Sequence, residues 1–333
     1  MTENVNHIGL KVGSQNTVAA LRENGTDEIK TRAIKTCVKY SSKTFKNLGT
    51  RPPTIGDEAV KYADAVWPLS FGIIKSDEGI QQTIDILKTL EIPTGADIVL
   101  ASPAMEMTDG KDRLSRAVKQ AAEFDRMWVF SEGVCSVVEI TCKPDIVRDS
   151  TFFSVNLGSS TTELCCSAEG VVKHLSAHSD MSGNRVDHDI LNRVRKSVGE
   201  EITIQKAREM KENASLGKVR TFQVQPLTEE GYRDFEVSAE VTDPLHEYVL
   251  SIVNIIQKEL YRNVDPIMRE TALEQPMFIS GGMANIDRLP ESIAQVLSEK
   301  MHREIKVAHS GDKKSHMAPA IGALMLCEAG IFE

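Results

Sequence analysis

The chain lacks the features that would bring it to a membrane or to a polyanion. None of its apolar stretches approaches the roughly 18 residues needed to span a bilayer, and residues 1–7 have neither the basic segment nor the apolar run of a signal peptide. It also lacks a basic run: 39 Lys and Arg residues stand against 48 Asp and Glu residues, a net charge of −9. Because phosphate neutralisation drives nonspecific nucleic-acid binding, we expect no nucleic-acid partner and no membrane-insertion segment.

Cysteine is sparse, and no two cysteines form a Cys-x-x-Cys pair. Six scattered cysteines in a chain of 333 residues predict reduced, buried thiols in the cytoplasm. The adjacent Cys165 and Cys166 lie in a strand-like run and would point to opposite faces, which argues against zinc. His174, His178 and His188 show no metal-ligand spacing, so we expect them at the surface or at a hinge, and we expect no metal site.

The hydrophobic pattern alternates between strands and helices over a length that suits about two domains of ~150 residues. Apolar residues make up 41% of the chain and charged residues 26%, which is typical of a folded protein. Residues 30–51 are rich in basic and polar side chains and are expected to form a small, solvent-exposed excursion. Helices are predicted over 76–90, 113–124, 187–198, 204–214 and 243–263, and buried strands over 96–101, 127–130 and 277–279.

One pattern, a strand followed by a small-residue turn and a second strand, occurs twice. It covers residues 8–21, with the turn at 13–16, and residues 152–166, with the turn at 158–161. This weak repeat predicts two similar lobes. A third turn, at 280–283, also follows a strand. Each turn alone is more often an ordinary tight turn, but glycine lets a backbone approach phosphates closely, and the three together favour phosphate binding.

Several short motifs occur in a fixed order along the chain. Residues 55–59 (Ile-Gly-Asp-Glu-Ala) and 67–74 (Trp-Pro-Leu-Ser-Phe-Gly-Ile-Ile) are similar to two actin signatures, and 208–212 (Arg-Glu-Met-Lys-Glu) resembles the actin helix that contacts the nucleoside. Residues 280–282 resemble the loop on the adenine side. The chain length and the segment at 131–132 are more similar to prokaryotic actins of the MreB and MamK type. The resemblance, in this order of motifs, runs from about residue 8 to about residue 326.

This resemblance implies an α/β fold of the actin-like, duplicated ribonuclease H-like type, with two lobes around a nucleotide cleft. Lobe I would contain residues 1–148, with subdomain IA at 1–28 and 66–148 and the small subdomain IB at 29–65. Lobe II would contain residues 149–315, with IIA at 149–179 and 244–315 and IIB at 180–243. Residues 316–333 would form a C-terminal helix that returns to lobe I.

The resemblance also implies an ATP or ADP site, whose residues carry over position by position. Glu132 falls where bacterial actins keep the carboxylate that positions the attacking water, although by itself it would be an exposed residue at the end of a strand. The remaining positions form two phosphate loops, a ribose and adenine contact, and a loop against the base: Gly13, Ser14, Gln15 and Asn16; Gly158, Ser159, Ser160 and Thr161; Lys211 and Glu212; and Gly281, Gly282 and Met283.

Two positions depart from the family pattern. Lys11 and Asn156 stand where the family has the aspartates that hold the hydrated magnesium ion, and an ammonium group is no ligand for Mg²⁺. One alternative is that Lys11 replaces the metal as the counter-charge to the phosphates. The other is a nucleotide-free cleft in which Lys11 pairs with Glu132, or with another acid across the cleft, and locks the lobes. Either way we expect weak or absent hydrolysis and doubt a role for Mg²⁺.

The resemblance implies a cytoskeletal protein that assembles head-to-tail with copies of itself into filaments. The alternative is a non-polymerising, degenerate ATPase of the actin fold that acts as a nucleotide-sensing or scaffolding adaptor. A sugar or acid kinase would need a carboxylate base near the first turn, where Lys11 stands, so this third class is disfavoured.

Overall fold

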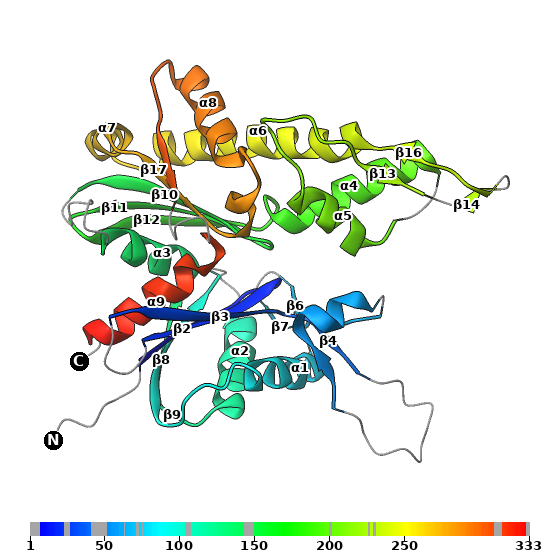
Figure 1. Ribbon diagram of the computed structural model, residues 1–333. Helices are drawn as coiled ribbons and strands as arrows, with labels where there is room; N and C mark the ends of the chain where they lie inside the picture. The colour runs from blue at the N-terminus through cyan, green and yellow to red at the C-terminus, as the bar shows by residue number, and fades with distance from the viewer. Residues whose placement is uncertain are drawn as a thin grey trace, which may run out of the picture. The chain divides into compact units, whose positions relative to one another are not determined.

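The chain folds into two compact units, which are shown in a computed structural model (Figure 1). The first contains Met1–Lys143 and Met317–Glu333, and the second contains Pro144–His316. The C-terminal segment therefore belongs to the first unit. The residues that the structure describes are 7–22, 27–40, 52–62, 64–70, 73–74, 76–103, 108–142, 150–199, 202–225, 227–228, 231–309 and 315–330.

Each unit is built on a five-stranded sheet, and the two sheets have the same topology. Three antiparallel strands come first along the chain, and two further strands extend each sheet in parallel. In the first unit the order is β3 (Ile29–Lys35), β2 (Asn16–Arg22), β1 (His7–Val12), β8 (Ala96–Ser102) and β9 (Phe124–Ser131). In the second it is β12 (Val171–His178), β11 (Thr162–Ala168), β10 (Phe152–Leu157), β17 (Met277–Ser280) and β18 (Val307–His309). The duplication predicted from the repeated turn is therefore confirmed.

The duplication extends to single hydrogen bonds. At or next to the start of the second strand of each sheet lies a buried threonine, whose hydroxyl bonds to the segment that follows the third strand. Thr17 Oγ1 lies 2.9 Å from Thr36 Oγ1 in the first unit, and Thr162 Oγ1 donates to the Met181 carbonyl at 2.5 Å in the second. In both units this bond fixes the end of the first hairpin against the chain that leaves the sheet.

Helices cover both faces of the sheet of the first unit. Because side chains alternate along a strand, Ile98 and Leu100 pack under α1 (Asp77–Lys88) and α2 (Thr108–Ala121), whereas Val99 and Ala101 pack against α3 (Glu132–Thr141) and α9 (Ala318–Ala329). Short elements complete the unit: β4 (Val38–Lys39), β5 (Thr54–Ile55), the 3₁₀ helix η1 (Gly56–Lys61), β6 (Leu69–Ser70) and β7 (Ile73–Ile74).

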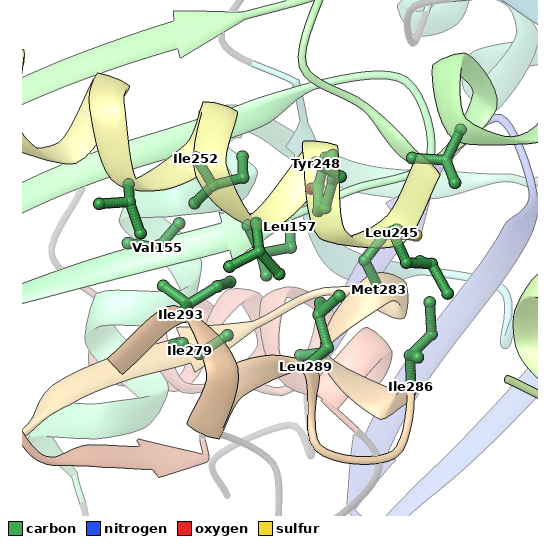
Figure 2. Close-up of a cluster of buried hydrophobic side chains, with 14 of the residues drawn as sticks. Val155, Leu157, Leu245, Tyr248, Ile252, Ile279, Met283, Ile286, Leu289 and Ile293 are labelled. Carbon is green, nitrogen blue, oxygen red and sulfur yellow. The ribbon is translucent and has the colours of Figure 1, made fainter. Parts of the chain in front are cut away.

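The second unit has one large apolar core. Helices α4 (Gly183–Val198), α5 (Ile204–Glu212), α6 (Ser238–Arg262) and α8 (Leu289–Met301) contribute to it, together with one face of β10 and β11. Figure 2 shows Val155 and Leu157 from the sheet beneath Leu245, Tyr248 and Ile252 of α6. Short elements are β13 (Gln223–Val224), β14 (Leu227–Thr228), β15 (Gly231–Tyr232), β16 (Phe235–Glu236), the 3₁₀ helix η2 (Gly282–Asn285) and η3 (Ser315–Met317), which joins the units.

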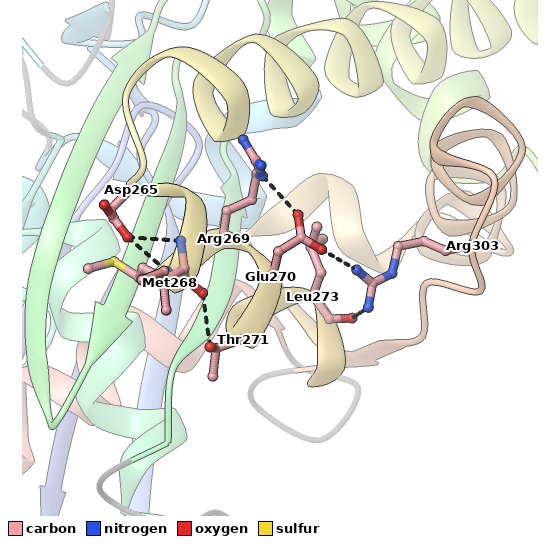
Figure 3. Close-up of polar contacts among 8 residues, drawn as sticks. Asp265, Met268, Arg269, Glu270, Thr271, Leu273 and Arg303 are labelled. Atoms are coloured by element: carbon pink, nitrogen blue, oxygen red, sulfur yellow. Dashed lines mark hydrogen bonds and ion pairs between the residues drawn. The ribbon is translucent and has the colours of Figure 1, made fainter.

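Helix α7 (Pro266–Glu274) contacts β10 and is fixed by polar bonds at both ends (Figure 3). The Asp265 side chain caps its first turn by accepting from the amides of Ile267 and Met268, at 2.9 and 3.2 Å. Near its other end, Arg303 donates to the Glu270 carboxylate at 3.1 Å and to the Leu273 carbonyl at 3.2 Å.

Several sequence expectations need correction. The excursion predicted at residues 30–51 begins later, because β3 pairs with β2 as an edge strand of the large sheet. The sequence did not predict β3 because its lysine and arginine side chains obscure the alternation of apolar and polar residues. Charged side chains of this kind are typical of edge strands. Residues 41–51 of this segment lie outside the described residues. The helix predicted at 243–263 starts at Ser238, so Pro244 lies inside it rather than in its first turn. Cys142 is exposed, whereas the other five cysteines are buried as predicted.

Two of the three histidines expected at the surface or a hinge form a cluster inside the second unit. His174 Nε2 and His178 Nε2 on β12 lie 2.9 and 3.5 Å from the two carboxylate oxygens of Glu259 on α6. Asn263 donates to the same carboxylate at 2.7 Å. Burial raises the pKa of Glu259, but the hydrogen bonds from Asn263 and His174 and the histidine charges outweigh it, so the pKa is lowered.

No helix among the described parts of the chain is both long enough and apolar enough to cross a membrane.

We predict that Glu259→Gln lowers the unfolding free energy at neutral pH by about 1–3 kcal/mol, because it weakens charged hydrogen bonds at a buried position. The pKa of the Glu259 carboxyl is lower in the folded protein than its unfolded value of 4.5. The ionised carboxylate therefore stabilises the fold at pH values above 4.5, and this stabilisation is lost as the pH falls through the lower pKa of the folded state. Urea unfolding across this acidic range should therefore show a weaker pH dependence in the variant. The control is Glu247→Gln. Glu247 lies on α6, like Glu259, and is an exposed partner of Arg193. Equal losses of unfolding free energy in both variants would contradict the prediction.

Helix α9 contacts its neighbours through two glycines. A Cβ atom at Gly9 of β1 would collide with the Ala320 carbonyl, and one at Gly322 of α9 would collide with the Cys135 carbonyl of α3. Backbone therefore lies directly against backbone at both contacts. We predict that Gly322→Ala destabilises the protein by about 3 kcal/mol, the upper end of overpacking costs, in thermal or urea unfolding. Gly282→Ala is the control, since a Cβ there meets no atom within 4 Å; an equally mild effect of both substitutions would refute this account.

Candidate nucleotide-binding site

The residues predicted to bind a nucleotide fall into two groups, one in each unit. In the first unit, the loop at 13–16 joins β1 to β2, and the Gly13 amide donates to the Asn16 carbonyl at 3.2 Å. The Gln15 carbonyl accepts from the Thr36 amide at 2.9 Å, which ties the loop to the chain after β3. Gly13 and Ser14 are buried, while Gln15 and Asn16 are partly exposed. The structure thus brings the four residues into one tight hairpin loop.

Lys11 and Glu132 lie beside this loop and face each other. Lys11 Nζ is 3.4 Å from Glu132 Oε2, and both side chains are less than 10% exposed. A Cβ on Gly13 would lie 3.3 Å from Lys11 Cε and 3.9 Å from Glu132 Oε1. Both side chains of the pair therefore lie next to Gly13, the first residue of the loop. Glu132 is the first residue of α3, whose N-terminus is capped by the Ser131 hydroxyl at 3.1 Å from the Val134 amide.

These positions correct two expectations. Glu132 taken by itself predicted an exposed residue at the end of a strand, but it is buried because the chain turns into α3 immediately after β9. The pairing of Lys11 with Glu132 is confirmed. It joins two residues of the same unit, however, so this ion pair is no lock between two lobes.

In the second unit, the loop at 158–161 repeats the geometry of the first. The Gly158 amide donates to the Thr161 carbonyl at 2.8 Å, and a Cβ at Gly158 would lie only 2.6 Å from that carbonyl oxygen. Asn156 precedes this loop by two residues, as Lys11 precedes Gly13. Its Oδ1 atom accepts a hydrogen bond from the Ser280 hydroxyl at 3.1 Å, and both residues are buried.

The first turn of α4 holds this loop in place. The Gly183 and Asn184 amides donate to the carbonyls of Gly158 and Ser159 at 3.1 and 2.7 Å. The Asn184 side chain also donates to the Ser160 hydroxyl at 3.2 Å. The amides at the helix start are therefore bonded to the loop backbone, and α4 acts here as a support for the loop.

Lys211, which was predicted to contact the nucleoside, also contacts the first turn of α4. Its Nζ atom donates to the Gly183 carbonyl at 3.0 Å and pairs with Asp187 Oδ1 at 2.6 Å. Arg208 Nε donates to the other oxygen, Asp187 Oδ2, at 3.0 Å. Burial lowers the pKa of Lys211, while the charge of Asp187 and its hydrogen bond oppose that shift. Glu212, the other residue predicted on this helix, is exposed.

The third turn also reaches Gly183. Gly281 adopts a φ of 91°, and a Cβ there would collide with the Leu157 backbone next to the second loop. The Met283 side chain is buried in the apolar core (Figure 2), and its Sδ atom would lie 2.9 Å from a Cβ on Gly183. Gly282 is exposed. The Met283 side chain therefore belongs to the apolar core. A base bound at this turn would be contacted by the turn backbone.

Sequence reasoning missed Gly183, Asn184 and Asp187, which connect the three predicted groups of the second unit. A signal was present, because Gly183 and Asp187 are one helical turn apart and Arg208 and Lys211 share a helix face. Their pairing across two helices is not visible in the sequence. Within the described ranges, no group of three or more His, Cys, Asp or Glu side chains is placed to hold a metal ion.

Comparison with known proteins agrees with this geometry. The family model called Salactin matches residues 5–330. The chain belongs to the salactin family. Salactin of Halobacterium salinarum (strain ATCC 700922 / JCM 11081 / NRC-1) is 25% identical over 336 residues, covering 96% of this chain and 91% of that protein.

Two solved structures share the fold of this salactin-family chain. One, described as a MamK double helical filament, matches with a TM-score of 0.80 and 22% identity, covering 98% of this chain and 99% of that chain. MreB5 of Spiroplasma citri bound to AMPPNP matches with a TM-score of 0.78 and 18% identity, covering 98% and 97%. The predicted prokaryotic actin-like fold is therefore confirmed.

We predict that Lys11→Met lowers the unfolding free energy by about 3–5 kcal/mol, because it leaves the Glu132 carboxylate buried without its cation. Urea unfolding measures the change. Adding Glu132→Gln to Lys11→Met should recover much of the loss, since the uncompensated charge is then gone. If the double variant is as unstable as the single one, the ion pair is not the source of the effect.

Proposed function

We propose that this protein is an actin-like cytoskeletal protein that assembles into filaments and binds a nucleotide with weak or absent Mg²⁺-dependent hydrolysis. The observation that carries the proposal is the duplicated sheet with a glycine hairpin loop at the same place in each copy. Membership of the salactin family supports it, as does the fold shared with a protein solved as a double helical filament.

Nucleotide binding is supported by the second unit, where the 158–161 loop, Lys211 and the 281–283 turn converge on Gly183. Glycine backbone and hydroxyl groups suit phosphates, and Lys211 supplies a point charge. The related fold of MreB5 has been solved with AMPPNP and with ADP, which fits ATP or ADP as the ligand here.

The residues present do not fit a magnesium ion at the positions that the family resemblance implies. Lys11 offers an ammonium group that already faces Glu132, and the side-chain Oδ1 atom of Asn156 accepts a hydrogen bond from the Ser280 hydroxyl. Magnesium requires hard oxygen ligands, usually carboxylates with retained waters. In our proposal Lys11 supplies the positive charge near the phosphates, and its pairing with Glu132 weakens that carboxylate as an acceptor for a water proton, so hydrolysis is slow.

Calorimetric titration with ATP tests the metal part of this proposal. We expect similar dissociation constants in EDTA and in Mg²⁺ for the wild-type chain, because no step of binding uses the metal. Lys11→Asp together with Asn156→Asp should make binding depend on Mg²⁺, which provides the matched comparison. Strictly Mg²⁺-dependent binding, or brisk phosphate release by the wild-type chain, would contradict the proposal.

Ultracentrifugation tests assembly. At micromolar concentration we expect the protein to sediment in a salt- or nucleotide-dependent way and to form filaments in negative-stain micrographs. The head-to-tail arrangement of subunits is part of the same proposal and is read from the subunit repeat in those micrographs. A protein that stays in the supernatant under every salt and nucleotide condition would instead support the alternative, a non-polymerising adaptor.

A further inference from the structure

Asp187 is an acidic partner shared by two buried cations, Arg208 and Lys211. Its side chain is fully buried, while those of Arg208 and Lys211 are 10% and 6% exposed. One carboxylate thus faces two cations, and both ion pairs lie away from water.

The three donors of the Lys211 ammonium group are not all used. Among the described residues, its Nζ atom donates to the Gly183 carbonyl at 3.0 Å and forms an ion pair with Asp187 Oδ1 at 2.6 Å. A lysine ammonium group carries three N–H donors. At least one N–H group is therefore left for a bound molecule.

Arg208 holds the Asp187 carboxylate in place against Lys211. By donating to Oδ2 at 3.0 Å, it prevents the Asp187 carboxylate from turning, so that Oδ1 stays directed at Lys211. Gly183 completes the arrangement, because it accepts from Lys211 and also donates its amide to Gly158 of the second loop. A Cβ at Gly183 would lie 3.3 Å from Lys211 Nζ and 2.9 Å from Met283 Sδ, so a larger residue there would have to displace these two side chains.

We propose that Asp187 is a positioning residue for nucleotide binding: it holds Lys211 against Gly183, so that the ammonium group meets the nucleoside while the phosphates meet the loop bonded to the same glycine. This inference rests on the proposed nucleotide binding. Asp187 itself touches no ligand in this arrangement. Its effect passes entirely through Lys211, and this requirement makes the proposal testable.

A double-mutant cycle tests it with ATP as the probe and the full-length protein in EDTA. Asp187→Asn should weaken ATP binding about tenfold, a coupling of ordinary size for directly contacting residues. Lys211→Met should weaken it by a similar factor. In the Lys211→Met background, Asp187→Asn should change the dissociation constant by less than about twofold. Asp189→Asn, which removes a partly exposed partner of Arg185 on the same helix, is the matched control and should leave binding unchanged.

The pH profile gives a readout that a purely structural role would not move. The charged groups in contact with the Lys211 side chain or nearby are Asp187, Arg208 and Glu212. Without the Asp187 charge the Lys211 ammonium group loses its proton at lower pH. ATP binding by Asp187→Asn should therefore decline at a lower alkaline pH than binding by the wild-type chain. Asp187→Glu keeps the charge, so its binding should decline at nearly the same alkaline pH as that of the wild-type chain, although the longer side chain displaces the carboxylate and weakens binding at neutral pH.

The outcomes separate the two proposals. If the wild-type chain binds no ATP, the proposed function is wrong and this inference falls with it. If the wild-type chain binds ATP and Asp187→Asn weakens binding equally with and without Lys211, Asp187 does not act through Lys211 and only the inference is overturned. Should Asp187→Asn fail to fold, Asp187→Glu takes its place in the cycle. If Asp187→Glu weakens ATP binding in the wild-type background but has no effect in the Lys211→Met background, the positioning role is supported. If Asp187→Glu leaves the ATP affinity unchanged in the wild-type background, the positioning role is overturned.

Discussion

Gly183 makes the close backbone contact on which the candidate site of the second unit depends. Its amide donates to Gly158 of the loop and its carbonyl accepts from Lys211, while the missing side chain leaves space for Met283 from the third turn. Segments separated by about 25 to 100 residues in the chain meet at this one position. Because protein interiors are close-packed and transmit small shifts, a displacement of the start of α4 would reach the loop, the lysine and the turn together.

The two units use the same scaffold with different chemistry at equivalent positions. In the first, the residue two places before the hairpin loop is a lysine that pairs with a carboxylate. In the second, it is an asparagine that accepts from a serine. The first position thus contributes an ion pair and the second a hydrogen bond between neutral side chains. Neither arrangement resembles a set of ligands for a hard cation, which is why we separate nucleotide binding from metal binding in this protein.

The sequence was sufficient for the fold, but not for the partners of the predicted site residues. The repeated small-residue turns at 13–16 and 158–161 predicted a duplicated architecture, because a strand, a glycine turn and a second strand are specified locally. The edge strand β3 was missed since its charged face conceals the alternation. The cluster of His174, His178 and Glu259 was missed because it joins β12 to α6, about 80 residues away. Pairing of this kind depends on tertiary packing, as does the role of Asp187.

The return of α9 to the first unit has a consequence for how the chain folds during synthesis. The second unit is one continuous segment, Pro144–His316, and all of its strands are synthesised before the last helix. The first unit begins earlier but ends later, because Gly9 of β1 and Cys135 of α3 are covered only when α9 arrives. Contacts between residues so distant in sequence slow folding. The unit that is translated first is therefore completed last, and until then the part of its sheet face that α9 covers is left for a chaperone, or for a neighbouring chain, to cover.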